Sequence, residues 1–140
     1  MTTNLRTPGG TPMKFTREEF ACPTTGELEF APDFLGSLHE LRTVYNKPMV
    51  VTSGCRSYEH NAKLIQEGLP ASPSSFHLIS NQKYNCNTCA LDVARMNGPD
   101  LGEFLFIAWS RSWSIGLAKT FIHLDRRIDN SIRPQTFYTY

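Results

Sequence analysis

Leu91-Asp92-Val93-Ala94-Arg95-Met96 is a segment in which apolar and polar positions alternate, and Asp92 has an alanine two residues away on either side. Successive side chains of a β-strand point to opposite faces, so Asp92 lies on the face opposite the leucine and the valine. Phe121-Ile122-His123-Leu124-Asp125 alternates in the same way and places His123 and Asp125 together on one face. The two segments predict strands that bury one face and present candidate ligands on the other.

The other elements follow from apolar periodicity and from turn residues. The predicted helices cover residues 15–20, 32–46, 58–67 and 100–112, and the further predicted strands cover 48–52, 114–118 and 120–125. Thr16 and Glu19 have the spacing of a capping box in the first helix. Because the connections between the late strands are short, these strands pair antiparallel. The predicted fold class is α+β, with a small antiparallel sheet that presents the site and is covered by helices.

Length and composition indicate a single folded domain. The chain has 140 residues, of which 40% are hydrophobic and 19% are charged, as is typical of a protein with a buried core. Residues 1–13 are rich in Thr, Pro and Gly, so we expect a flexible N-terminal tail or a strap over the surface, followed by the domain at 14–140. The net charge of +1 disfavours nucleic-acid binding, and no apolar run is long enough to span a membrane.

The N-terminal residues lack the apolar segment of a signal peptide, so we expect synthesis in a cytoplasm. The four cysteines, at positions 22, 55, 86 and 89, are too few for a disulfide framework. Cys86 and Cys89 form a lone C-x-x-C motif, and a structural zinc site needs a second pair at suitable spacing. We therefore expect two ordinary thiols, or a disulfide that forms late in an oxidising compartment.

His77, Asp92 and His123 form a candidate metal site. Two imidazoles and one carboxylate are the ligand set of hydrolytic zinc sites, where a fourth position stays open for water. Zinc lowers the pKa of this water to about 7, and a nearby carboxylate takes its proton. Asp125 is the first candidate for that carboxylate, although an ion pair with the two arginines that follow it is an equally good interpretation. Each of the three ligands taken alone also suits a structural role.

These residues resemble the zinc D-alanyl-D-alanine carboxypeptidase and murein endopeptidase family of cell-wall enzymes. The resemblance rests on Ser75-Phe76-His77, Ala90-Leu91-Asp92 and Phe121-Ile122-His123-Leu124-Asp125, and it extends over about residues 14–127. Further matches in family order are Glu19-Phe20-Ala21-Cys22-Pro23, Thr52-Ser53-Gly54-Cys55-Arg56-Ser57 and Glu59-His60-Asn61-Ala62. Among its branches, the chain is most similar to the short single-domain enzymes of phage genomes and bacterial murein endopeptidases.

The resemblance implies a role for each matched residue. His77, Asp92 and His123 hold Zn²⁺, Arg56 binds and stabilises the substrate near its carbonyl or carboxylate, and Ser75 shapes the substrate groove. Asp125 is the expected catalytic base because it lies two residues from His123 on the same strand face, and it matches a family position whose role is less settled. The chain departs from many relatives at Thr120, where they have the catalytic carboxylate. The chain also departs from the family by an insertion of about eight polar residues at 80–87, which we expect to form an enlarged loop at the rim of the site. The aromatic segment 137–140 is a further candidate for lining the groove.

The implied function is that of a zinc-dependent peptidase that cleaves peptide stems of bacterial peptidoglycan, as a phage endolysin or a murein endopeptidase or carboxypeptidase does. Such a protein is expected to be a monomer and to act at the cell wall or in the periplasm after release, or as a virion component. Two alternatives stay open. One is a zinc-binding module without catalytic activity, and the other is a virion-associated structural protein whose histidines bind no metal.

Overall fold

A computed structural model describes residues 3–140 of the chain. The strands are β1 (Asn4–Arg6), β2 (Pro12–Thr16), β3 (Val51–Ser53), β4 (Ala90–Ala94), β5 (Ser114–Leu117), β6 (Phe121–Asp125) and β7 (Phe137–Thr139). The helices are α1 (Arg17–Phe20), α2 (Phe34–Tyr45), α3 (Tyr58–Gln66), α4 (Gly98–Ser110) and α5 (Arg127–Asn130).

Five strands form one sheet in the order β3-β4-β6-β5-β7, and β1 pairs with β2 in a separate hairpin. The strands of the larger sheet are antiparallel except for β5 and β7, which are parallel. The predicted α+β class is therefore confirmed. The register places Asp92 opposite His123 and Leu91 opposite Leu124, so ligands and apolar residues alternate between the two faces as the sequence predicts.

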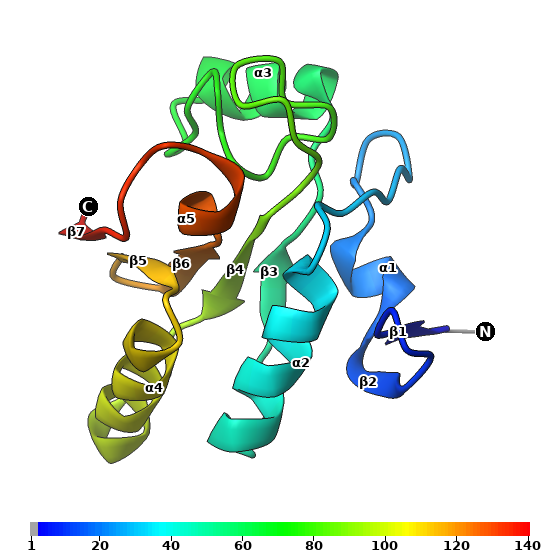
Figure 1. Ribbon diagram of the computed structural model, residues 1–140. Helices are drawn as coiled ribbons and strands as arrows, with labels where there is room; N and C mark the ends of the chain where they lie inside the picture. The colour runs from blue at the N-terminus through cyan, green and yellow to red at the C-terminus, as the bar shows by residue number, and fades with distance from the viewer. Residues whose placement is uncertain (1–2) are drawn as a thin grey trace.

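The apolar face of the sheet is covered by α2 and α4, which lie side by side (Figure 1). Leu91, Val93, Ile122 and Leu124 are completely buried in one core with residues of both helices. At about 25 cal/mol for each Å² of apolar surface removed from water, this core is the main source of stability. It fixes β4 and β6, the two strands that present Asp92 and His123.

The N-terminal hairpin begins within the segment that the sequence predicts to be a tail or a strap. Leu5 and Met13 are both buried in the main core, so residues 4–16 follow the strap alternative. The capping box is present as predicted, since the Glu19 backbone N–H donates to Thr16 Oγ1 and the Thr16 N–H donates to the Glu19 carboxylate.

Other differences from the predicted elements are small, apart from two omissions. Strand β3 begins at Val51 rather than Pro48, and α4 begins at Gly98 because Pro99 occupies its first turn. The sequence predicts neither α5 nor β7.

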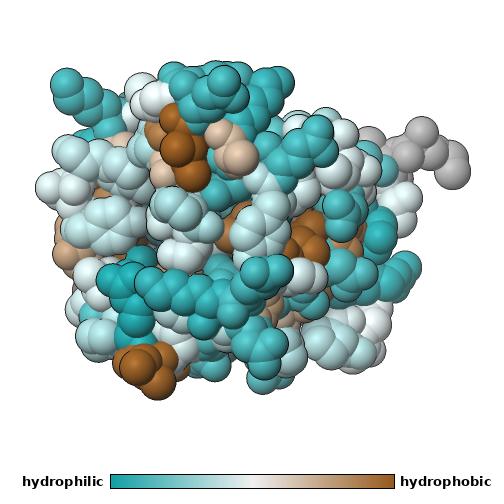
Figure 2. Space-filling model, turned by 90° about the horizontal axis from the view of Figure 1, so that it is seen from above, coloured by the Kyte–Doolittle hydropathy of each residue, from teal (hydrophilic) through white to brown (hydrophobic). Residues whose placement is uncertain are grey.

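Figure 2 shows a mainly hydrophilic face on which hydrophobic residues occur as separate spots. Within residues 3–140, none of the helices has the length and apolar character needed to cross a membrane.

Candidate metal centre

His77 lies in the loop that leads toward β4, and its backbone and ring are both fixed. Its N–H donates to Ser75 Oγ at 3.1 Å, and its carbonyl oxygen accepts from the Arg56 backbone N–H and the Thr88 hydroxyl, each at 2.9 Å. The imidazole is 1% exposed, and its Nδ1 lies 2.8 Å from the carbonyl oxygen of Gly54. These bonds fix His77 in place despite the insertion at 80–87 that follows it.

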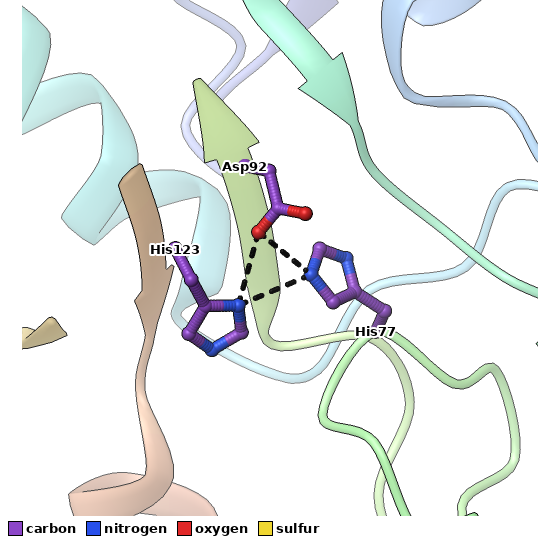
Figure 3. A group of neighbouring side chains, drawn as sticks. All are labelled: His77, Asp92 and His123. Carbon is purple, nitrogen blue, oxygen red and sulfur yellow. Dashed lines mark hydrogen bonds and ion pairs between the residues drawn. The ribbon is translucent and has the colours of Figure 1, made fainter. Parts of the chain in front are cut away.

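Asp92 and His123 approach His77 from adjacent strands, β4 and β6 (Figure 3). Asp92 Oδ1 lies 3.1 Å from His77 Nε2 and 3.0 Å from His123 Nδ1, and the two ring nitrogens are 3.2 Å apart. One ligand atom from each residue thus lies within 4.8 Å of the others. The three predicted metal ligands, which are separated along the chain, meet at one point.

Each of the two histidine rings makes a hydrogen bond on the side away from Asp92. These bonds determine which ring nitrogen of His77 and of His123 has a lone pair directed at the candidate metal position. A carbonyl oxygen can only accept, so His77 Nδ1 carries the proton in the bond to Gly54 and His77 Nε2 is left with a lone pair. His123 Nε2 donates to Asp125 Oδ2 at 2.7 Å, which likewise leaves Nδ1 free to act as a ligand. Two lone pairs and a carboxylate oxygen then face one another, an arrangement that requires a cation or a proton between them.

Electrostatics at the cluster lead to the same conclusion. Burial lowers the pKa of His77. Burial acts in the same direction on His123, but hydrogen bonds to Asp125 and Asp92 outweigh it and raise the pKa of His123 to about 10. Burial raises the pKa of Asp92, yet the adjacent charges and hydrogen bonds of both histidines hold it well below its usual range. The site therefore favours a positive charge, and this donor set and these tautomers fit zinc.

Asp125 occupies a different place from the one expected for a catalytic base. It is completely buried behind His123, where Oδ2 contacts His123 Nε2 and the Arg127 guanidinium, and Oδ1 accepts from the Arg127 backbone N–H and Nε. Burial raises its pKa, but these bonds hold the pKa at about 2. Asp125 forms an ion pair with Arg127 and is not among the residues that line the pocket in front of the ligands.

Arg56 is buried beside the cluster and is held on three sides. Its Nε donates to Ser53 Oγ at 3.2 Å, and its terminal nitrogens lie 3.4 Å from Asn61 Oδ1 and 3.4 Å from Asp92 Oδ2. A guanidinium fixed in this way can stabilise negative charge that develops next to the ligands.

A pocket of about 220 Å³ lies in front of the ligands. Its lining includes the three ligands, Arg56 and the predicted groove residue Ser75. Further lining residues that give it aromatic and basic walls are Phe76, Tyr84, Arg127, Arg133, Tyr138 and Tyr140. Among the lining residues of the described chain, Asp92 is the single carboxylate.

The inserted loop at 80–87 contributes one wall of this pocket. Tyr84 stacks on Phe76 with ring centroids 4.6 Å apart, and its hydroxyl accepts from Arg133 at 3.3 Å. Asn81 anchors the loop, since its amide nitrogen donates to the carbonyl oxygen of Ser75 at 3.0 Å. The loop therefore lies at the rim of the site, as expected from its polar sequence.

A buried cluster of two histidines and one carboxylate at the floor of an open pocket is the arrangement found in metallohydrolases. The family model for Peptidase M15 matches residues 13–125, and the chain belongs to this family of metallopeptidases. The resemblance inferred from the sequence over about residues 14–127 is thereby confirmed. Comparisons with curated proteins and with solved structures gave no match.

Several residues of the site have no signal in the sequence alone. The Gly54 carbonyl and Asn61, which position His77 and Arg56, lie in the matched segments 52–57 and 59–62, but their contacts depend on how the loops fold. Arg127 follows the predicted strand, where the sequence indicates only an ion-pair partner for Asp125. All four cysteines are free thiols in the structure.

Proposed function

We propose that this metallopeptidase is a zinc-dependent enzyme that cleaves peptide stems of bacterial peptidoglycan, as an endolysin or as a murein endopeptidase or carboxypeptidase. The observation that carries the proposal is the convergence of His77 Nε2, Asp92 Oδ1 and His123 Nδ1 at the floor of the pocket. Zinc bound there supplies a coordinated water of lowered pKa and polarises a carbonyl oxygen. Three protein ligands leave room for that chemistry, whereas a structural site has four.

The residues around the ligands have separate parts in this proposal. Asp125 is a positioning residue, because its bond to His123 Nε2 holds the ring so that Nδ1 faces the metal position. Arg56 binds the substrate carbonyl or carboxylate and stabilises negative charge on it. Ser75 forms part of the groove and also orients the His77 backbone. The proposal thus retains His77, Asp92, His123, Arg56 and Ser75 from the sequence and changes the role of Asp125.

A peptide stem suits the shape and charge of the pocket. The walls contain the stacked rings of Phe76 and Tyr84 and the guanidinium of Arg133, whose described polar partner is the Tyr84 hydroxyl. Peptidoglycan stems are short and have free carboxylates, so a basic pocket complements them. We further propose that the protein acts as a monomer on the wall, after release from the cytoplasm in which it is made or as part of a virion.

Digestion of purified peptidoglycan tests the proposed function. The protein is loaded with zinc, incubated with the peptidoglycan, and the soluble fragments are identified by mass spectrometry. We expect fragments with newly exposed termini within the stem, and we expect none from Asp92→Asn or His123→Ala protein, in which a ligand is lost. Bound zinc without any cleavage would instead support an inactive zinc-binding module, and absence of bound zinc would support a structural protein.

A further inference from the structure

Four residues form a row across the sheet that leads from the metal ligands to the last strand. Asp92 pairs with His123, His123 pairs with Gly116, and Gly116 pairs with Tyr138. Residues paired in register share one face of a sheet, so Tyr138 belongs to the same face as the ligands. The ring centroids of Tyr138 and His123 are 6.3 Å apart.

Gly116 is the reason that the Tyr138 ring can lie across β5 toward the ligands. A Cβ built on Gly116 would be 2.6 Å from Cζ and 2.7 Å from the hydroxyl oxygen of Tyr138, which is closer than real Cβ contacts. Any other residue at this position would displace the ring. The Arg127 guanidinium lies 5.8 Å from the centroid of the same ring and restricts it from another side.

Tyr140 places a second hydroxyl next to the first. The two phenol oxygens are 3.5 Å apart, and the Tyr140 ring packs edge-on against Phe121 with centroids 5.2 Å apart. Both tyrosines line the pocket in front of the ligands. Burial, the bond to Tyr138 and the charge of Asp92 together raise the pKa of the Tyr140 hydroxyl.

The pocket needs groups that stabilise the charge of a peptide undergoing hydrolysis. Arg56 is one such group, and Asp125, the carboxylate that the sequence predicts as a base, is buried behind His123. A phenol hydroxyl can donate a hydrogen bond to an oxygen atom. Donors that are fixed in advance around a developing oxyanion contribute strongly to catalysis, and tyrosine hydroxyls serve in this way.

We propose that Tyr138 and Tyr140 are catalytic residues whose hydroxyls donate hydrogen bonds to the scissile carbonyl oxygen as negative charge develops on it. The inference rests on the proposed peptidase function and adds to it a pair of donors supplied by β7 and the residue after it. No covalent bond forms to either tyrosine, and neither loses its proton. Their contribution is greater in the transition state than in the bound substrate, so it affects kcat more than KM.

The test compares Tyr138→Phe, Tyr140→Phe and the matched control Tyr45→Phe. Tyr45 is buried against Phe104, outside the pocket. With a soluble muropeptide that the zinc-loaded wild type cleaves, we expect each pocket substitution to lower kcat about 100-fold with KM changed less than about twofold. A second readout is the affinity of the zinc-loaded proteins for the phosphinate analogue of D-alanyl-D-alanine, a tetrahedral anion, which should weaken in the same two variants. Zinc content, and all properties of the control, should stay unchanged.

The outcomes separate this inference from the proposed function. Wild-type kcat and wild-type phosphinate affinity in both pocket variants would overturn the inference and leave the proposed function intact. A rise in KM at constant kcat would also overturn it, because the hydroxyls would then bind only the ground state. If the wild type cleaves no muropeptide, the proposed function fails, and unchanged phosphinate affinity in the variants would overturn the inference as well. If the wild type cleaves the muropeptide but does not bind the phosphinate, the kcat comparison alone decides the inference. If it neither cleaves the muropeptide nor binds the phosphinate, both are overturned.

Discussion

At the scale of single residues, Asp125 contacts a candidate metal ligand without lining the pocket in front of it. Its carboxylate holds the outer nitrogen of His123 and is itself held by Arg127. Because such outer partners orient the ligand and increase its basicity, their loss typically weakens metal binding 10–100-fold. We expect Asp125→Asn to lower zinc affinity by about this factor, measured by competition with a chromophoric chelator.

Asp129→Asn provides the matched control for this substitution. Asp129 lies on helix α5 and pairs with Arg126, the residue before this helix. Its side chain is far more exposed than that of Asp125, so its replacement should leave zinc affinity unchanged. Wild-type zinc affinity in Asp125→Asn, combined with a loss of activity, would contradict the positioning role. It would favour the role of base that the sequence predicted for Asp125.

Gly116 is the second position at which one residue decides the shape of the site. Gly116→Ala places a methyl group against the Tyr138 ring, so we expect kcat to fall about tenfold. In the Tyr138→Phe background the hydroxyl is already absent, and the same change should cost less than about twofold. Gly36→Ala on α2 is the control, because its Cβ meets no atom within 4 Å. Equal losses of kcat in both backgrounds would show that Gly116 acts independently of the Tyr138 hydroxyl.

At the scale of secondary structure elements, the alternation of apolar and polar residues predicted the features that depend on the local backbone alone. The alternation in 90–94 and 121–125 correctly placed Asp92 and His123 on one face, since side-chain direction along a strand follows from the backbone alone. Strand β7 has three residues and pairs in parallel with β5, so its position depends on the assembled sheet. The role of Asp125 could not be predicted either, because it depends on the ring nitrogen of His123 that it contacts.

The junction between α1 and α3 gives rise to a pH dependence of stability. Cys22 follows α1, and its Sγ accepts from the backbone N–H of Ser57, the N-cap of α3, at 3.3 Å. Burial raises the pKa of the Cys22 thiol, but hydrogen bonds from Ser57 and Thr25 lower it from 9.0 to about 7. A thiol whose pKa is lower in the folded protein stabilises it fully above the unfolded pKa, and this contribution is lost as the pH falls through the folded pKa.

Urea unfolding of the reduced wild type and of Cys22→Ser at pH 6 and pH 9 checks this sign. We expect the stability advantage of the wild type to grow by about 1–2 kcal/mol between these pH values. Cys55→Ser is the control, since burial raises the pKa of the Cys55 thiol and its contribution cannot grow over this range. An advantage that stays constant or shrinks from pH 6 to pH 9 would contradict the stabilised Cys22 thiolate.

At the scale of the whole molecule, the candidate metal ligands come from parts of the chain that the sequence alone could relate only by resemblance. His77 lies in a loop, where no periodicity fixes side-chain direction, and fourteen residues separate it from Asp92. Two hydrogen bonds hold His77 beside Asp92. His77 Nδ1 donates to the Gly54 carbonyl oxygen, and the Arg56 backbone N–H donates to the His77 carbonyl oxygen. An ion held by His77, Asp92 and His123 would therefore link this loop to the centre of the sheet.

Such a link predicts that zinc stabilises the entire fold. A ligand that binds the folded state alone contributes about 2.7 kcal/mol when its free concentration is 100 times Kd. For a chain of 140 residues we expect chelation of zinc to lower the thermal unfolding midpoint by about 8 °C. In scanning calorimetry with and without zinc, Asp129→Asn should keep this shift, and Asp92→Asn, which lacks one ligand, should lose it. An equal shift in Asp92→Asn would place the stabilising ion elsewhere in the molecule, since a site built from His77, Asp92 and His123 cannot hold zinc equally well without its carboxylate.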